Sequence, residues 1–201
     1  MKKLDHYFYN RADVVNIARE LLGKVLVTQW DGAVTSGRIV ETEAYRGITD
    51  RASHAWNCRR TRRTEIMYEE GGKGYVYLCY GIHHLFNVVT NIKDTPHAVL
   101  VRAVEPLEGI STMLQRTGKI KADRTLTSGP GNVSKALGLL VSHSGISLLE
   151  EAVFIADDGY ALKKKDIVAT TRIGVDYAGE DALLPYRFFI RDNIYVSGRR
   201  Q

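Results

Sequence analysis

Two glutamates and a tyrosine stand at alternate positions in the stretch GRIVETEAY, residues 37–45. In a β-strand successive side chains point to opposite faces, so Glu41, Glu43 and Tyr45 would share one face. Two carboxylates on one face repel each other, and each loses hydration if it is buried. The local sequence therefore favours an edge strand with its acidic side chains in water. The alternative is that one carboxylate lies in a pocket beside the aromatic ring, where it can activate a water molecule.

A partner for a buried carboxylate is present in the segment AVLVRAV, residues 98–104. Apolar residues on both faces of this segment predict a central strand, and Arg102 lies within it. A guanidinium in a buried strand needs an anion. Glu41 or Glu43 on a neighbouring strand could supply that anion, which supports the buried alternative.

Positive charge is concentrated in the predicted loop over residues 46–64, and above all in RRTRR at 59–63. Such a run is either a solvated surface or a set of phosphate contacts. Further along, the glycine-proline turn SGPG at 128–131 leads into a predicted helix with Lys135 in its first turns. A helix N-terminus preceded by glycines can bind a phosphate.

A β-hairpin is predicted with strands near residues 75–79 and 84–89 and a tip at residues 80–83. The tip sequence is Tyr-Gly-Ile-His, although turn tips normally carry small polar residues. Tyr80 and Ile82 therefore either fold back onto a core or form an exposed wedge that inserts into a bound partner.

The composition bounds the class of protein. The chain has 201 residues, of which 44% are hydrophobic and 25% charged, with a net charge of +5 and 11 tyrosines. A basic, tyrosine-rich surface suits nucleic acid. The two cysteines, Cys58 and Cys79, form no CxxC motif and the histidines no HxxxH pair, which argues against structural zinc and a disulfide framework. With no signal core or membrane-length apolar stretch, we expect a cytoplasmic or nuclear protein.

The remaining elements are mainly strands. An apolar stripe at i, i+3, i+4, i+7 and i+8 from Val14 predicts a helix over residues 11–22, with Asn10 as N-cap and Gly23 as its stop. A short helix is predicted near 108–115, and further strands near 24–30, 153–156, 167–175 and 186–190. An Asp31-Gly32 turn should join the strand at 24–30 to the glutamate strand. With no βαβ series, we expect one α+β domain over residues 1–201: a curved, mainly antiparallel sheet with peripheral helices and a protruding hairpin.

Six blocks, in order along the chain, carry a specific resemblance. They are GRIVETEAYRG with DRASHA, YVYLCYG, FNVV, VLVRAVEPLEG, SGPGNVSKAL and RIGVDYAGE. Together they resemble the alkyladenine DNA glycosylase family, also called 3-methyladenine or methylpurine DNA glycosylases, from about residue 5 to residue 197. The resemblance implies a base-excision-repair enzyme that flips damaged purines out of duplex DNA and hydrolyses the N-glycosidic bond, leaving an abasic site. Whether deaminated purines are also substrates stays open.

The resemblance also implies catalytic roles. Glu43 matches the general base that deprotonates a water molecule for attack on C1′ of the flipped nucleotide. Arg102 and the carbonyl of Val175 match the groups that hold this water. Tyr80 matches the wedge that enters the minor groove and fills the gap left by the nucleotide. Glu41 receives no catalytic role, and we expect it to be paired structurally.

Four further residues match base-binding positions of the family. Tyr45 and Tyr77 match the aromatic residues that sandwich the base. His54 matches the residue that packs beside the base and offers a backbone N–H to its edge. Asn87 matches the residue that discriminates against guanine through its exocyclic amine.

Contacts with the DNA backbone are expected from Arg60, Arg62, Ile82, His83 and Lys135. The loop departs from the family pattern, because TRRT stands at 61–64 where TPRN is usual, so these contacts cannot be transferred one by one. The expected partner is double-stranded DNA containing damaged purines, bound by a monomer that needs no metal, no organic cofactor and no membrane. The expected location is the cytoplasm, at the nucleoid, if the source is bacterial, and the nucleus if it is eukaryotic.

Two other functions compete with this interpretation. One is a bifunctional glycosylase/lyase or a nuclease that uses the SGPG turn. It would require a catalytic lysine or a cluster of acidic metal ligands, and neither can be assembled from the sequence. The other is a non-catalytic nucleic-acid-binding module, in which Glu43 has only a structural role.

Overall fold

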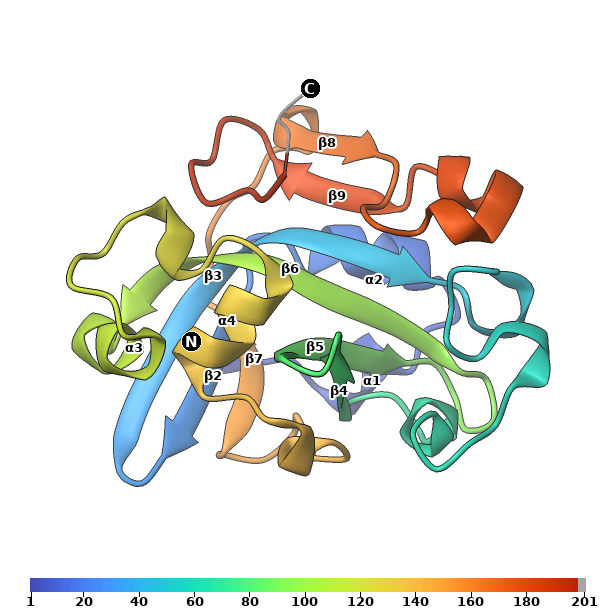
Figure 1. Cartoon of the computed structure of the whole chain (residues 1–201), viewed down its shortest axis with the longest axis horizontal. Helices are drawn as coiled ribbons and strands as arrows, with labels where there is room; N and C mark the ends of the chain where they lie inside the picture. Colours follow the sequence, from blue (N-terminus) through green and yellow to red (C-terminus); the bar gives the residue numbers. More distant parts are fainter. Residues whose placement is uncertain (199–201) are drawn as a thin grey trace.

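One antiparallel sheet organises the molecule (Figure 1). The structure is a computed structural model that describes residues 1–198, and within them nine strands join in the order β1-β7-β2-β3-β6-β5-β4, with β9 and β8 extending from β3. The strands are β1 (Lys2–Lys3), β2 (Val25–Trp30), β3 (Ala33–Tyr45), β4 (Gly74–Cys79), β5 (His83–Thr90), β6 (His97–Glu108), β7 (Val153–Asp157), β8 (Ile167–Thr170) and β9 (Arg187–Ile190). The predicted α+β class with a mainly antiparallel sheet is confirmed.

Short helices cover the sheet (Figure 1). The α-helices are α1 (His6–Tyr9), α2 (Val14–Glu20), α3 (Ile110–Thr117) and α4 (Pro130–Leu137). The 3₁₀ helices are η1 (Gly47–Thr49), η2 (Trp56–Cys58), η3 (Glu65–Tyr68), η4 (Arg124–Leu126), η5 (Val141–His143), η6 (Lys164–Asp166) and η7 (Asp176–Leu183). None of the helices in residues 1–198 is long and apolar enough to cross a membrane.

Strand β3 is the centre of the fold. Its first half pairs with β2 through the turn at Asp31 and Gly32, whose φ angles of 52° and 77° are those of the predicted tight hairpin. Its second half pairs with β9, and β6 runs along its other edge. The β3–β6 register shifts on either side of Glu41. Such bulges redirect side chains, and these lie where the glutamates meet Arg102.

The two faces of β3 have different coverings. Thr42 donates its hydroxyl to the carbonyl of Ala18 in α2 at 2.8 Å, so α2 covers the face that carries Thr42. Because side chains alternate, Glu41 and Glu43 point to the other face. Figure 1 shows the loop after β3 and helix η7 at the same end of that strand. These two segments supply the walls around the glutamate face.

The structure corrects the predicted first helix. Helix α1 ends at Tyr9, and Asn10 is its C-cap rather than the N-cap of a helix over 11–22. Helix α2 begins after Asp13, whose carboxylate accepts the N–H of Asn16 at 3.0 Å. The prediction failed because the segment offers two cap residues and the charged one lies directly before the apolar stripe.

Two further predictions were wrong in extent. Lys135 lies in the last turn of α4, not the first, because the helix begins at Pro130 and ends at Leu137. The strand predicted over 167–175 stops at Thr170. There the chain turns so that Arg172 can enter a buried ion pair with Asp50, and this partner lies too far away in the sequence to be read from a local pattern.

Candidate functional site

A cavity of about 370 Å³ lies on the glutamate face of the sheet. Its walls come from the end of β3, the loop after β3 with η3, the hairpin β4–β5, strand β6, and the start of η7 with the segment before it. The lining residues are Tyr45, Ala52, His54, Met67, Tyr75, Tyr77, Cys79, Tyr80, Leu85, Asn87, Ala98, Leu100, Arg102, Ile173, Gly174, Val175 and Tyr177. The structure thus brings seven predicted site residues to one cavity: Tyr45, His54, Tyr77, Tyr80, Asn87, Arg102 and Val175.

Glu43 lies directly behind the wall of this cavity and is 0% exposed. Its Oε1 accepts the backbone N–H of Ile173 at 2.8 Å and lies 3.3 Å from Nη1 of Arg102. Its Oε2 accepts the hydroxyl of Tyr45 at 2.8 Å. All three partners line the cavity. Glu43 is therefore buried beside the aromatic residue and does not face water.

Glu41 is also buried, and it shares one of its partners, Arg102, with Glu43. Oε1 accepts from Nε of Arg187 at 2.7 Å and from Nε of Arg102 at 3.1 Å. Oε2 accepts the backbone N–H of Ser197 at 2.6 Å. Two arginines thus balance two glutamates, as burial of charge requires. The expected structural pairing of Glu41 is confirmed.

Tyr45 and Tyr77 present aromatic rings to the cavity. Burial and the nearby Glu43 carboxylate raise the pKa of Tyr45 well above its usual value. Burial likewise raises the pKa of Tyr77. Both hydroxyls therefore stay protonated at neutral pH, and both rings keep the electron-rich faces that attract a flat cation.

His54 lines the cavity and is held by a hydrogen bond between its Nδ1 and the hydroxyl of Tyr75 at 2.8 Å. Burial, with Arg63 and Arg59 nearby, lowers the pKa of His54 to about 4, so the ring is neutral at pH 7. Burial raises the pKa of Tyr75 to about 12, so its hydroxyl is protonated at pH 7 as well. Within residues 1–198 the backbone N–H of His54 has no acceptor, which leaves it available to a ligand.

Asn87 is fixed by its amide nitrogen, which donates to the carbonyls of Tyr75 at 3.1 Å and Leu85 at 3.2 Å. Reversing the amide would set its oxygen against two carbonyls, so this orientation is the favoured one. The amide oxygen is left as the polar group that Asn87 can offer to the cavity that it lines.

The hairpin tip projects into solvent. Tyr80 is 89% exposed and Ile82 71% exposed, so the tip does not fold back onto a core. Tyr80 and Gly81 adopt positive φ angles of 51° and 73°. This conformation is uncommon for an aromatic residue. The tip therefore holds Tyr80 outward at the rim of the cavity.

The residues predicted to contact the DNA backbone lie outside the cavity. Arg60 forms ion pairs with Glu65 and Asp94, whereas exposed Arg62 has no ion-pair partner among the described residues. Exposed His83 lies against Gly131 at the start of α4. Lys135 donates to the carbonyl of Thr117 at 3.2 Å. Their contacts with DNA stay predictions.

Three groups at the site were missed by the sequence analysis. The N–H of Ile173 holds Glu43, and no side-chain pattern could have indicated a backbone group. Arg172 pairs with Asp50 and donates to the carbonyl of Ala44 at 3.0 Å, which ties the end of β3 to the loop and to the segment before η7. Tyr177 lines the cavity and is exposed. Its position two residues after Val175, a predicted site residue, could have indicated that it lies at the site.

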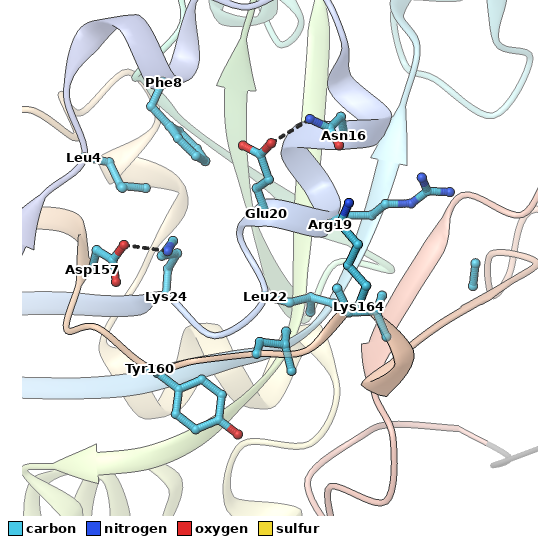
Figure 2. A pocket seen from close by; sticks show the side chains of 13 residues that line it. Leu4, Phe8, Asn16, Arg19, Glu20, Leu22, Lys24, Asp157, Tyr160 and Lys164 are labelled. Carbon is cyan, nitrogen blue, oxygen red and sulfur yellow. Dashed lines mark hydrogen bonds and ion pairs between the residues drawn. The ribbon is translucent and has the colours of Figure 1, made fainter.

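A second cavity, of about 850 Å³, lies between α1, α2 and the chain that follows β7 (Figure 2). Three of its charged side chains have partners in the lining: Lys24 pairs with Asp157, and Glu20 accepts from Asn16. None of the predicted site residues lines it. Across residues 1–198, no group of three or more His, Cys, Asp or Glu residues is placed to hold a metal ion.

Comparison with known proteins identifies a protein family that matches most of this chain. The family described as "Methylpurine-DNA glycosylase (MPG)" matches residues 7–194. Three bacterial relatives bear the name "Putative 3-methyladenine DNA glycosylase". The protein of Chlamydia abortus is 48% identical over 93% of this chain and 97% of its own, and that of Chlamydia pneumoniae is 45% identical over 93% and 94%. The protein of Desulfitobacterium hafniense is 44% identical over 98% and 99%.

Proposed function

Because the chain belongs to the methylpurine-DNA glycosylase family, we propose that it excises alkylated purines from duplex DNA by hydrolysis, with Glu43 as the general base. Membership makes it a DNA glycosylase of base excision repair that acts on alkylated bases. The proposal that Glu43 is the general base rests on one observation. Its carboxylate is fully removed from bulk water and lies directly behind a cavity walled by tyrosines. A carboxylate held in this way can act on a single bound water molecule.

The proposed step is a displacement at C1′ of a flipped nucleotide. Glu43 takes a proton from the water as the water oxygen bonds to C1′. The bond between C1′ and the base nitrogen breaks, and its electron pair leaves with the base. Arg102 and the carbonyl of Val175 hold the water. The Val175 carbonyl accepts one hydrogen bond, from the N–H of Ala178 at 2.8 Å, and its second lone pair is available.

The chemistry of the base explains why one carboxylate suffices. Alkylation at N3 or N7 makes a purine cationic, so the base leaves as a neutral molecule and needs little acid catalysis. The negative charge of Glu43 also stabilises an oxocarbenium-like transition state, as in glycoside hydrolysis. The same cationic charge favours stacking between Tyr45 and Tyr77.

The exposed hairpin tip supports base flipping. An aromatic side chain held outward at the rim of the cavity can enter the duplex and fill the space of the extruded nucleotide. We therefore assign Tyr80 as the wedge. The basic loop around Arg62 would contact phosphates and position the duplex without reading its sequence.

The lining of the cavity favours hydrolysis over lyase chemistry. No lysine is among the described residues that line it, so no amine is placed to form a Schiff base at C1′. We propose that the enzyme is monofunctional and leaves an intact abasic site. We also propose that it acts as a monomer. Since the relatives are bacterial, we propose the cytoplasm, at the nucleoid, as its location.

The decisive test measures release of free base from duplexes that each contain one defined lesion. The wild type should release 3-methyladenine or 7-methylguanine and leave the strand uncut. Glu43→Gln should lower the single-turnover rate about 1,000-fold while it keeps its affinity for the lesion duplex. A covalent adduct trapped by borohydride would contradict the monofunctional proposal. Unchanged base release by Glu43→Gln would favour the non-catalytic role of this residue.

A further inference from the structure

We propose that the hydroxyl of Tyr45, separately from its ring, positions the carboxylate of Glu43 for catalysis. This inference rests on the proposed function of Glu43. The ring of Tyr45 was assigned to base stacking, and that role leaves the hydroxyl unexplained. The hydroxyl lies 2.8 Å from Oε2 of Glu43. Tyr45 thus connects the wall on which a base would stack to the group that would activate the water.

The hydrogen bond from Tyr45 matters because it occupies one of the few acceptor positions on the Glu43 carboxylate. A carboxylate offers about four acceptor positions, two on each oxygen. On Oε1 the N–H of Ile173 fills one, and the guanidinium of Arg102 lies beside this oxygen as an ion pair at 3.3 Å. On Oε2 the hydroxyl of Tyr45 fills one. The second acceptor position of Oε2 stays open, and the hydroxyl of Tyr45 decides where that position points.

Arg102 cannot fix the carboxylate alone. Its Nε bonds to Glu41 at 3.1 Å, while its Nη1 lies 3.3 Å from Glu43, so its hold on Glu43 is the longer of the two. The N–H of Ile173 bonds the same oxygen, Oε1, and a carboxylate held at one oxygen can still rotate about its last bond. The hydroxyl of Tyr45 supplies the second point that prevents this rotation.

The guanidinium of Arg172 lies over the ring of Tyr45 and helps to hold it in place. The guanidinium carbon of Arg172 lies 4.9 Å from the ring centroid. Arg172 is fixed in turn by its ion pair with Asp50 and by the carbonyl of Ala44. Because Tyr45 stays protonated, its hydroxyl is a permanent donor to the carboxylate. The direction of that donor is set by groups that do not touch the substrate.

The test separates the hydroxyl from the ring. Tyr45→Phe should lower the single-turnover rate of 7-methylguanine release 10- to 100-fold, while its affinity for a duplex with a stable abasic-site analogue changes less than threefold. Tyr45→Ala, which also removes the ring, should lose rate and the selectivity for cationic bases. Tyr68→Phe is the matched control: its hydroxyl bonds the carbonyl of Arg59 at 3.3 Å, outside the cavity, so its rate should match wild type.

The outcomes distinguish this inference from the proposal that supports it. If Tyr45→Phe releases base at the wild-type rate, or if its rate and affinity fall together, the hydroxyl does not position Glu43. If Glu43→Gln is as active as wild type, the general base itself is wrong. Loss of activity in Glu43→Gln with full activity in Tyr45→Phe overturns only the inference. Thermal unfolding of each variant excludes misfolding as the cause of a lost rate.

Discussion

Arg187 donates its Nε to Oε1 of Glu41 at 2.7 Å, deep in the sheet where β9 meets β3. Arg102 contacts the same oxygen and also reaches Glu43. Because Arg187 balances the charge of Glu41, Arg102 is left to balance Glu43. The two glutamates are equivalent in the strand pattern, and the arginine from β9 gives one of them a structural role.

Glu41→Gln should therefore destabilise the fold. The change leaves two buried guanidiniums with one carboxylate, and removal of one partner from a buried ionic network costs about 3 kcal/mol. Denaturant unfolding measures this loss. Adding Arg187→Met to Glu41→Gln should recover part of the stability, because the double variant removes both members of the pair. A Glu41→Gln protein as stable as wild type would show that the pair adds no net stability.

The buried pair of Asp50 and Arg172 should be needed for the fold in a way that a surface pair is not. Asp50→Asn leaves Arg172 buried without a counter-charge, and we expect a loss of about 3 kcal/mol in the free energy of unfolding. Arg60→Ala, which breaks the exposed pairs with Glu65 and Asp94, should leave stability close to wild type. Equal losses in both variants would refute the distinction.

Tyr80→Ala should weaken binding to a lesion duplex about tenfold, since an aromatic side chain that stacks in DNA contributes roughly 1–3 kcal/mol. The melting temperature should not change, because the side chain is 89% exposed. Tyr7→Ala is the matched control: Tyr7 is 84% exposed but lies on α1, away from the cavity. Equal affinities of the two variants would remove Tyr80 as the wedge.

Arg62 should contribute to the salt dependence of DNA binding. It is exposed and unpaired among the described residues, so it is available to a phosphate. If Arg62 neutralises one phosphate, Arg62→Ala should reduce the slope of log Kobs against log salt concentration by about 0.9. Arg60→Ala should reduce it less, because Arg60 already pairs with two carboxylates. Binding titrations at several salt concentrations measure both slopes.

His54 should make stability depend on pH between its two pKa values. In the unfolded chain its pKa is near 6.5, and in the fold burial lowers the pKa to about 4. Between these values the unfolded state binds more protons, so stability falls as the pH drops from 6.5 to 4. We expect this side chain to account for about 3 kcal/mol of that loss. His54→Gln should flatten the curve; an unchanged curve would contradict the lowered pKa.

Much of the fold could be predicted because its signals are local. The turn at Asp31 and Gly32, the hairpin with Tyr80 at its tip, and the buried strand around Arg102 depend on neighbours within a few residues. The pairing of Arg102 with the glutamates also followed from a local fact. A charged residue in an apolar strand requires a counter-charge.

The sequence by itself determined which residues could do chemistry and which strand face they share. It did not determine burial, because alternation assigns a side chain to a face but not to solvent or core. Only the tertiary structure brought Ile173 to Glu43 across 130 positions of sequence and Ser197 to Glu41 across 156. These backbone contacts carry no side-chain pattern. They are what gave Glu41 its structural place and left Glu43 behind the cavity.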